Sequence, residues 1–196
     1  MMMRRFTDNP DDWDEVIGGL LDLIGEDLDR EGLRDTPQRV MRAWRERLAG
    51  YAQDPAEILA RSFGESEGYD QMVLLRGIRF DSTCEHHLMR FSGVAHVAYI
   101  PNPENPRVLG LSKMARLVDC FANRLTLQER ITQLVANAID EHLQPLGVGV
   151  VLVSEHGCIA CRGVRKAGAE CVTSALRGVL REGEARAEFF RMTQMR

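Results

Sequence analysis

The spacing of apolar residues changes along this chain, and the change limits the folds that it can adopt. Residues 12–29 and 36–48 carry apolar residues at helical spacing. The second segment opens on Thr36, which can cap a helix, and on Pro37, which suits the first helical position. After an acidic connector over 50–70, the pattern becomes strand-like.

The later segments predict a mixed domain. The expected elements are strands at 71–80 and 93–100, helices at 112–124 and 127–143, two strands that meet at a tight turn over 147–164, a further strand at 170–180 and a short helix in the tail. Strands on both sides of a central helix pair predict an α+β fold.

Composition narrows the class of protein. With 196 residues, 44% of them hydrophobic, the chain can bury a core, and no run approaches the roughly 18 apolar residues of a membrane span. The net charge of −4 disfavours a general nucleic-acid binder. Five cysteines at irregular spacing indicate reduced thiols and hence a cytoplasmic protein.

Residue types that bind metals crowd into two short segments. Cys84 and His87 have C-x-x-H spacing, so a single turn can direct both side chains to one point. Farther along, His156 and Cys158 are two residues apart and would share one face of an extended strand. Thiolate and imidazole are ligands that zinc prefers. Either segment alone would fit buried core residues, but together they predict a zinc site.

Two ligand sets fit this spacing. The closed set is a structural Cys3His site made by Cys84, His87, Cys158 and Cys161. The open set omits Cys161 and leaves the fourth coordination position for water. Two spare imidazoles, His86 and His156, favour the open set because hydrolysis needs proton donors and acceptors within reach. Spacing alone leaves both sets possible.

Several segments resemble the signature segments of GTP cyclohydrolase I: STCEHHL, AHVAYIP, GLSKMARLVDCFANRLTLQERIT, PLGVGVV and EHGCIACRGVRK, with GLRDTPQRV resembling the family's N-terminal helix motif. The resemblance implies the tunnelling fold, in which a helix pair packs on one face of an antiparallel sheet. It implies a catalytic domain at 71–196, an N-terminal helical segment at 1–70, and a homodecamer. The reaction it implies converts GTP and water to formate and 7,8-dihydroneopterin triphosphate, the first step of folate and pterin biosynthesis.

The resemblance also assigns roles to individual residues. Cys84, His87 and Cys158 match the family's Zn²⁺ ligands, while His86 and His156 match its acid–base histidines. For guanine, Glu129 matches the carboxylate that accepts from N1–H and the 2-amino group, with Gln128 as a second contact. The residues expected to bind the triphosphate are Ser112, Lys113, Arg116, Arg162, Arg39 and Arg42.

Some of these residues have simpler explanations in the sequence. The segment TLQE is a capping box, with Thr126 as N-cap and Glu129 at the third helical position. Each basic residue, Arg42 above all, could be a solvated surface charge. Glu85 is expected to orient backbone or imidazole groups.

The chain departs from the family pattern in three places: Cys161 replaces a common Met, Gly157 is smaller than usual, and the loop PNPENPR (101–107) is longer. Two rival functions therefore stay open. One is a binding or assembly module with a closed Cys3His zinc, and the other is a related tunnelling-fold enzyme that acts on another purine or pterin.

Overall fold

The structure is a computed structural model that describes residues 6–60, 62–63 and 68–194. It consists of two compact units, of which the first ends at Ala49 and the second begins at Gly50. The division into an N-terminal helical segment (1–70) and a catalytic domain (71–196) is a functional one and stays a prediction. In the described parts of the chain, no helix combines the length and the apolar character needed to cross a bilayer.

The first helix of the first unit, α1, spans Pro10–Leu23. The side chain of Asn9 caps it by accepting a hydrogen bond from the backbone N–H of Asp11. The sequence predicted a helix as far as residue 29, which is wrong at its C-terminal end. Gly25 has a φ of +82°, and this left-handed conformation stops the helix.

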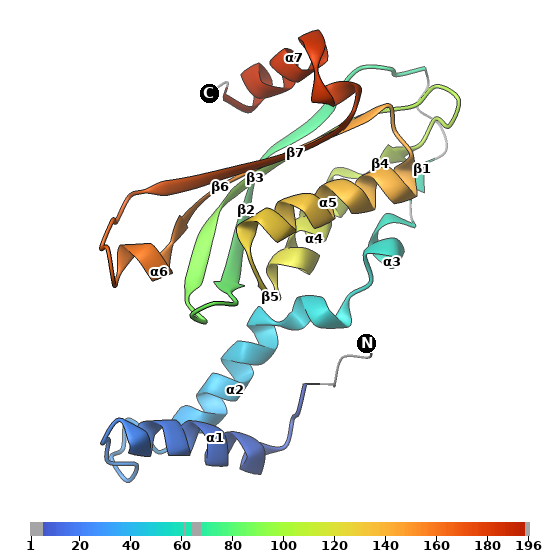
Figure 1. The fold of residues 1–196 in the computed structure, drawn as a ribbon. Helices are drawn as coiled ribbons and strands as arrows, with labels where there is room; N and C mark the ends of the chain where they lie inside the picture. Colours follow the sequence, from blue (N-terminus) through green and yellow to red (C-terminus); the bar gives the residue numbers. More distant parts are fainter. Residues whose placement is uncertain (1–5, 61, 64–67, 195–196) are drawn as a thin grey trace. The chain divides into compact units, whose positions relative to one another are not determined.

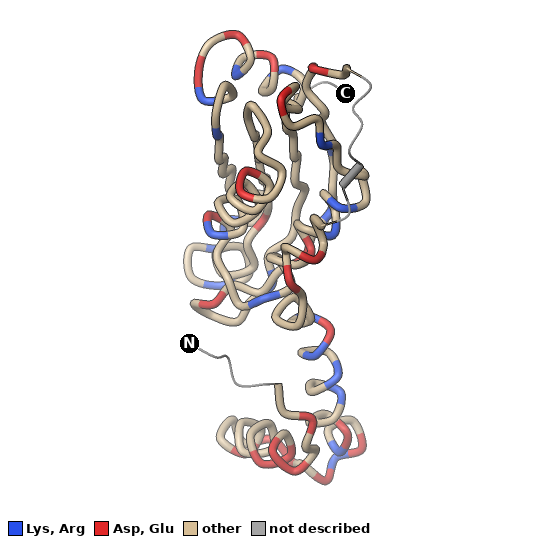
Figure 2. Tube along the Cα trace, turned by 90° about the vertical axis from the view of Figure 1, so that its right-hand side faces the viewer, with Lys and Arg blue, Asp and Glu red and all other residues tan. Residues whose placement is uncertain are grey.

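The second helix of this unit, α2, spans Thr36–Arg47, as predicted to within one residue. Thr36 is not its cap, however. Asp35 holds the N-cap position, and the Thr36 hydroxyl donates to the carbonyl of Gly32 at 3.4 Å. Figure 2 shows basic residues following one another along α2, whereas acidic residues gather on α1.

The second unit is built on a five-stranded sheet with the order β5-β2-β3-β6-β7. Its long strands pair antiparallel, and the short β5 pairs parallel to the end of β2. The strands are β2 (Val73–Cys84), β3 (Arg90–Ile100), β5 (Leu125–Thr126), β6 (Gly147–His156) and β7 (Glu170–Gly178), with a separate pair β1 (Ser62–Phe63) and β4 (Val108–Leu109).

Helices lie on both faces of this sheet (Figure 1). The pair α4 and α5 covers one face, and α7 covers part of the other. The helical segments of the unit are η1 (Ala49–Ala52), α3 (Pro55–Leu59), α4 (Leu111–Ala122), α5 (Gln128–Leu143), α6 (Gly157–Ala160), η2 (Val179–Arg181) and α7 (Gly183–Gln194). The predicted α+β fold, with a helix pair on one face of an antiparallel sheet, is confirmed.

The core between the sheet and the helix pair follows from alternation along the strands. In β3, Phe91, Ala95, Val97 and Tyr99 are buried against α4 and α5, where Met114, Leu117, Ile131 and Ile139 are fully buried. On the opposite face, Phe189 of α7 packs over Gly149. A Cβ at residue 149 would lie 2.9 Å from the Phe189 ring, so only glycine permits this approach.

The prediction of two strands meeting at a tight turn over 147–164 is wrong in its second half. β6 ends at His156, the short helix α6 follows, and the next strand begins only at Glu170. The apolar alternation stops after Val153, and the backbone N–H of Cys161 then bonds to the carbonyl of Gly157 at 3.1 Å, which is a helical contact. His156 and Cys158 therefore do not share the face of one strand.

The loop 101–107 caps the C-terminus of α5. The Asn105 side chain donates to the carbonyl of Leu143 at 3.2 Å, and Arg107 donates to that of His142 at 3.2 Å. Asn102 reaches the carbonyl of Gln144 at 3.5 Å. These are the carbonyl groups that a helix end leaves without intrahelical partners. The additional length of this loop thus has a structural use.

We expect Asn105→Ala to destabilise the fold by about 1 kcal/mol, the usual net value of one hydrogen bond. The denaturant midpoint of unfolding measures this loss. Glu104→Ala is the matched control, because Glu104 lies in the same loop and makes only a backbone contact there. Equal midpoints for the two variants would contradict the capping role.

Candidate metal and substrate site

Three side chains converge where β2, the following turn and α6 meet. Each of Cys84, His87 and Cys158 offers one ligand atom, and these atoms all lie within 4.8 Å of one another. No other cluster of three or more His, Cys, Asp or Glu residues with this geometry occurs among the described residues. The grouping matches the ligand set predicted from the sequence.

A tight turn brings His87 back beside Cys84. The backbone N–H of Leu88 donates to the carbonyl of Cys84 at 2.9 Å, and that of Cys84 donates to the carbonyl of Met89 at 2.8 Å. Leu88 has a φ of +55°, which is uncommon for a residue with a side chain. The paired strands β2 and β3 fix both ends of this turn.

α6 delivers the third ligand. A Cβ at Gly157 would lie 2.7 Å from the carbonyl oxygen of Arg90, so the small residue lets β6 end close to β3. The Cys161 thiol donates to the carbonyl of Gly157 at 2.9 Å and lies 3.9 Å from the sulfur of Met89. Cys161 is not among the three converging ligands, which supports the open set.

The chemistry of these donors fits zinc. Two thiols and one imidazole form a borderline-soft set, and three protein ligands are typical of catalytic zinc sites. Burial raises the pKa of the Cys158 thiol, and the neighbouring Cys84 raises it further, whereas the charge of Arg162 lowers it. Two thiolates at this separation need a cation to offset their repulsion.

His156 stands beside this group but is not part of it. Its ring stacks on Phe91, with centroids 4.5 Å apart and planes at 4°, and its Nε2 lies 2.8 Å from Oε1 of Gln128. Burial lowers the pKa of His156, while the nearby carboxylate of Glu129 acts in the opposite direction. His86 is exposed in the turn next to His87.

Gln128 lies inside the protein, with 1% of its surface exposed. Both ends of its amide already have protein partners, in Leu152, Cys171, Thr173, Ser154 and His156. It contacts a candidate catalytic histidine, whereas the sequence predicted a contact with guanine. One signal was available: Gln128 and Thr132 form a polar pair at i and i+4 on the otherwise apolar face of α5.

Glu129 is exposed, and the predicted capping box does not form. Leu127 is the N-cap of α5 and makes no side-chain cap, so Glu129 is the second helical residue and not the third. The Thr126 hydroxyl donates to the carbonyl of Leu127 at 3.4 Å. The charge of Glu129 affects the pKa of His156 and of Cys171, which places the carboxylate beside the site.

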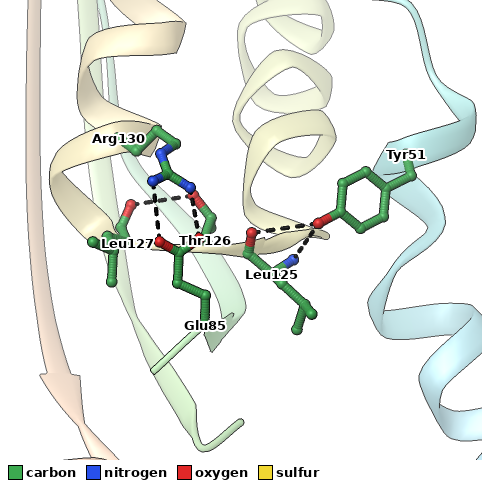
Figure 3. Close-up of polar contacts among 6 residues, drawn as sticks. All are labelled: Tyr51, Glu85, Leu125, Thr126, Leu127 and Arg130. Atoms are coloured by element: carbon green, nitrogen blue, oxygen red, sulfur yellow. Dashed lines mark hydrogen bonds and ion pairs between the residues drawn. The ribbon is translucent and has the colours of Figure 1, made fainter. Parts of the chain in front are cut away.

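An ion pair joins the metal-binding turn to the start of α5 (Figure 3). Arg130 donates to both carboxylate oxygens of Glu85, at 2.6 and 3.0 Å. The backbone N–H of Glu85 also donates to the carbonyl of Thr126 at 3.1 Å. On the other side of β5, the Tyr51 hydroxyl bonds both backbone groups of Leu125. The Glu85 carboxylate thus binds a guanidinium, whereas the sequence led us to expect that it orients backbone or imidazole groups.

Ser112, Lys113 and Arg116 lie in the first half of α4, the half that begins near the opposite end of β3. The N-terminus of α4 follows Leu109, whose N–H donates to the Tyr99 hydroxyl at 2.9 Å. Tyr99 stands eight residues beyond Phe91 in β3, about 26 Å along an extended strand. The other end of α4 lies near the metal ligands, because the Ser82 hydroxyl donates to the carbonyl of Ala122.

The remaining basic residues divide between the two units. Arg162 is exposed just after α6, close enough for its charge to lower the pKa of Cys158. Arg39 and Arg42 belong to α2 in the first unit. Arg39 pairs there with Asp35 at 3.1 Å.

Comparison with known proteins identifies the family. The family profile described as GTP cyclohydrolase I matches residues 14–194. The chain belongs to the GTP cyclohydrolase I family. It is 54% identical over 174 residues to GTP cyclohydrolase 1 of Mycolicibacterium vanbaalenii, covering 88% of this chain and 85% of that protein. It is 50% identical over 175 residues to GTP cyclohydrolase 1 of Streptomyces coelicolor, covering 89% and 86%.

Within the GTP cyclohydrolase I family pattern, the three departures of this chain have structural counterparts. Gly157 allows the approach to Arg90, the loop 101–107 caps α5, and Cys161 packs on Met89. Two of the three departures therefore lie close to the Cys84, His87 and Cys158 group, and none falls on a member of that group.

We expect Glu85→Gln to weaken zinc binding by less than about tenfold. The change removes the charge attraction to Arg130 but leaves the backbone bond to Thr126, and exposed ion pairs contribute about 0–1 kcal/mol. Competition against a chelator measures the zinc affinity. Glu104→Gln, in the loop 101–107, serves as control. If the two variants bind zinc equally well, the ion pair does not position the turn.

Proposed function

We propose that this chain is a zinc-dependent GTP cyclohydrolase of the cytoplasm. It would open the imidazole ring of GTP at C8, release formate and form 7,8-dihydroneopterin triphosphate. The observation that carries the proposal is the convergence of Cys84, His87 and Cys158 beside an imidazole, that of His156, which is not a ligand. Membership of the GTP cyclohydrolase I family supplies the substrate.

Zinc and the histidines beside its ligands would have different roles in the reaction. When bound, zinc supplies a Lewis acid that activates water near neutral pH. His86 and His156 transfer protons to and from the opening ring, because each is an imidazole beside the ligands without being one of them. This division explains why two more imidazole groups stand here than a closed structural site would use.

Charged groups around the metal ligands would recognise the nucleotide. The exposed carboxylate of Glu129 would accept from N1–H and the 2-amino group of guanine, which adenine does not present in this form. Arg162 is exposed and its charge acts on the Cys158 thiol, so it would bind the phosphates. Because Gln128 is enclosed, we assign it no contact with the nucleotide.

We infer that a second copy of the chain contributes to the phosphate site. Ser112, Lys113 and Arg116 lie in the first half of α4, and the opposite end of this helix, at Ala122, is the one bonded to β2 near the metal ligands. A symmetric homodecamer, as the family resemblance implies, would bring α4 of one subunit to the metal ligands of another. Arg39 and Arg42 would also act on a neighbouring subunit.

The two rival functions make different predictions. A binding module with a closed Cys3His site needs Cys161 as a ligand and tolerates loss of His86 and His156. A related enzyme acting on another purine or pterin would keep these histidines but lack the use of Glu129 for guanine. The position of Cys161 outside the converging group weighs against the first rival.

The function is tested by incubating the purified, zinc-loaded protein with GTP and measuring formate and the fluorescent oxidised neopterin. Cys158→Ser should lose zinc and turnover together. His86→Ala should keep zinc and lose turnover by roughly 10²- to 10⁴-fold, the usual contribution of an acid–base group. Turnover that survives in both variants would refute the proposal.

A mixing experiment tests the shared site. We expect Cys158→Ser and Lys113→Ala to be inactive separately and active when coexpressed as mixed oligomers. If metal ligands and Lys113 come from different subunits, about one site in four would receive both intact parts by random assembly. Each variant coexpressed with itself under a second tag is the control. No recovery in verified mixed oligomers would place Lys113 and the ligands in one chain, and activity of Lys113→Ala by itself would make Lys113 dispensable.

A further inference from the structure

The buried amide of Gln128 has a fixed orientation. Its Nε2 lies 3.0 Å from the carbonyl oxygen of Leu152 and 3.0 Å from that of Cys171, two groups that can only accept hydrogen bonds. Exchanging the nitrogen and oxygen of the amide would place Oε1 against both carbonyl oxygens. The nitrogen must therefore face β6 and β7, and Oε1 must face the other way.

A closed chain of hydroxyl groups supports the same orientation. The Thr173 hydroxyl also lies 3.1 Å from the Gln128 nitrogen, so the two amide hydrogens are shared among three acceptors. The Thr132 hydroxyl donates to the backbone carbonyl of Gln128 at 2.8 Å, so the Thr173 hydroxyl donates to Thr132 across their 2.7 Å contact. Each hydroxyl hydrogen in this chain has one acceptor, and the order is consistent throughout.

The orientation of Gln128 determines where His156 carries its proton. Oε1 of Gln128 accepts from the Ser154 hydroxyl at 2.6 Å, and its second partner is Nε2 of His156 at 2.8 Å. Since an amide oxygen only accepts, Nε2 must donate. A neutral imidazole has one N–H, so its other nitrogen, Nδ1, is left with a free lone pair.

The ring is also held in place, and Nδ1 is left open. Stacking on Phe91 at 4.5 Å with nearly parallel planes prevents rotation of the ring away from Gln128. In the described part of the chain, no protein group hydrogen-bonds to His156 Nδ1, and this atom is not among the buried polar atoms that lack a partner. Nδ1 is thus available to a bound molecule.

We propose that Gln128 is a positioning residue that holds His156 in its Nε2–H tautomer, so that Nδ1 is the atom that exchanges a proton with the substrate. The proposal rests on the proposed function for the participation of His156 in the reaction. The tautomer itself follows from hydrogen-bond geometry alone. Gln128 then acts through His156 and not through contact with guanine.

Neutron crystallography of the zinc-loaded wild type tests the tautomer without reference to activity. The crystals would be held at a pD about two units above the ordinary pKa of histidine, so that the ring is neutral. The expected result is deuterium on Nε2 of His156 and none on Nδ1. Deuterium on Nδ1 overturns the proposal, whatever the protein does to GTP.

Gln128→Met tests the consequence for turnover, because methionine has a similar length and no acceptor oxygen. We expect kcat to fall at least about tenfold, part of the 10²- to 10⁴-fold that an acid–base group contributes. KM for GTP and zinc content should stay within about twofold of the wild type. Thr173→Val is the matched control: it removes one bond to Gln128, leaves the bond to His156, and should keep kcat near the wild-type value.

The outcomes separate the possible roles of Gln128. A raised KM with unchanged kcat would make Gln128 a contact with GTP and overturn the proposal, as would unchanged values of both. If Gln128→Met does not fold, the neutron experiment decides alone. If the wild type does not open GTP at all, the proposed function fails, while the position of the deuterium still tests the tautomer.

Discussion

The antiparallel register of β2, β3 and β6 is the constraint on which the site depends. Thr83 pairs with Arg90, and Phe91 pairs with His156, so two segments about seventy residues apart in sequence meet at one end of the sheet. A slip of one residue would turn every side chain of a strand to the opposite face. The alternating apolar residues of β3 and β6 prevent such a slip, because one face is buried against α4 and α5.

Buried polar residues then fix the orientation of a side chain that the strand register brings to the site. Gln128, Thr132 and Ser154 are each at most 2% exposed, and buried polar groups are costly unless all their bonds are made. Here Thr132 and Ser154 donate to Gln128, and Gln128 bonds to His156. An apolar core would be more stable here, whereas the buried polar network fixes the orientation of one imidazole. Such an arrangement is expected where catalytic groups must be held in place.

Periodicity predicted the long elements, because it is a local property of the sequence. Spacing indicated a metal site but left Cys161 possible as a ligand, and the family resemblance favoured Cys84, His87 and Cys158. Both kinds of sequence pattern failed where contacts between distant segments determine the local structure. Beyond His156 the chain forms the helix α6 and not the predicted strand, and Gly157 lies close to Arg90 of another strand. The enclosure of Gln128 depends on β6 and β7, and the distance of Lys113 from the ligands depends on how α4 crosses the sheet. The enclosure of Gln128 has one signal within its own segment, the polar pair that it forms with Thr132 on α5.

The central claim is that zinc binds to Cys84, His87 and Cys158 and keeps an open position, with Cys161 left out. X-ray absorption spectroscopy of the zinc-loaded wild type measures this most directly, since zinc–sulfur distances of about 2.3 Å and zinc–nitrogen distances of about 2.0–2.1 Å are distinct. The open site predicts two sulfur and two nitrogen or oxygen neighbours. Three sulfur neighbours would contradict it and would indicate a closed Cys3His site.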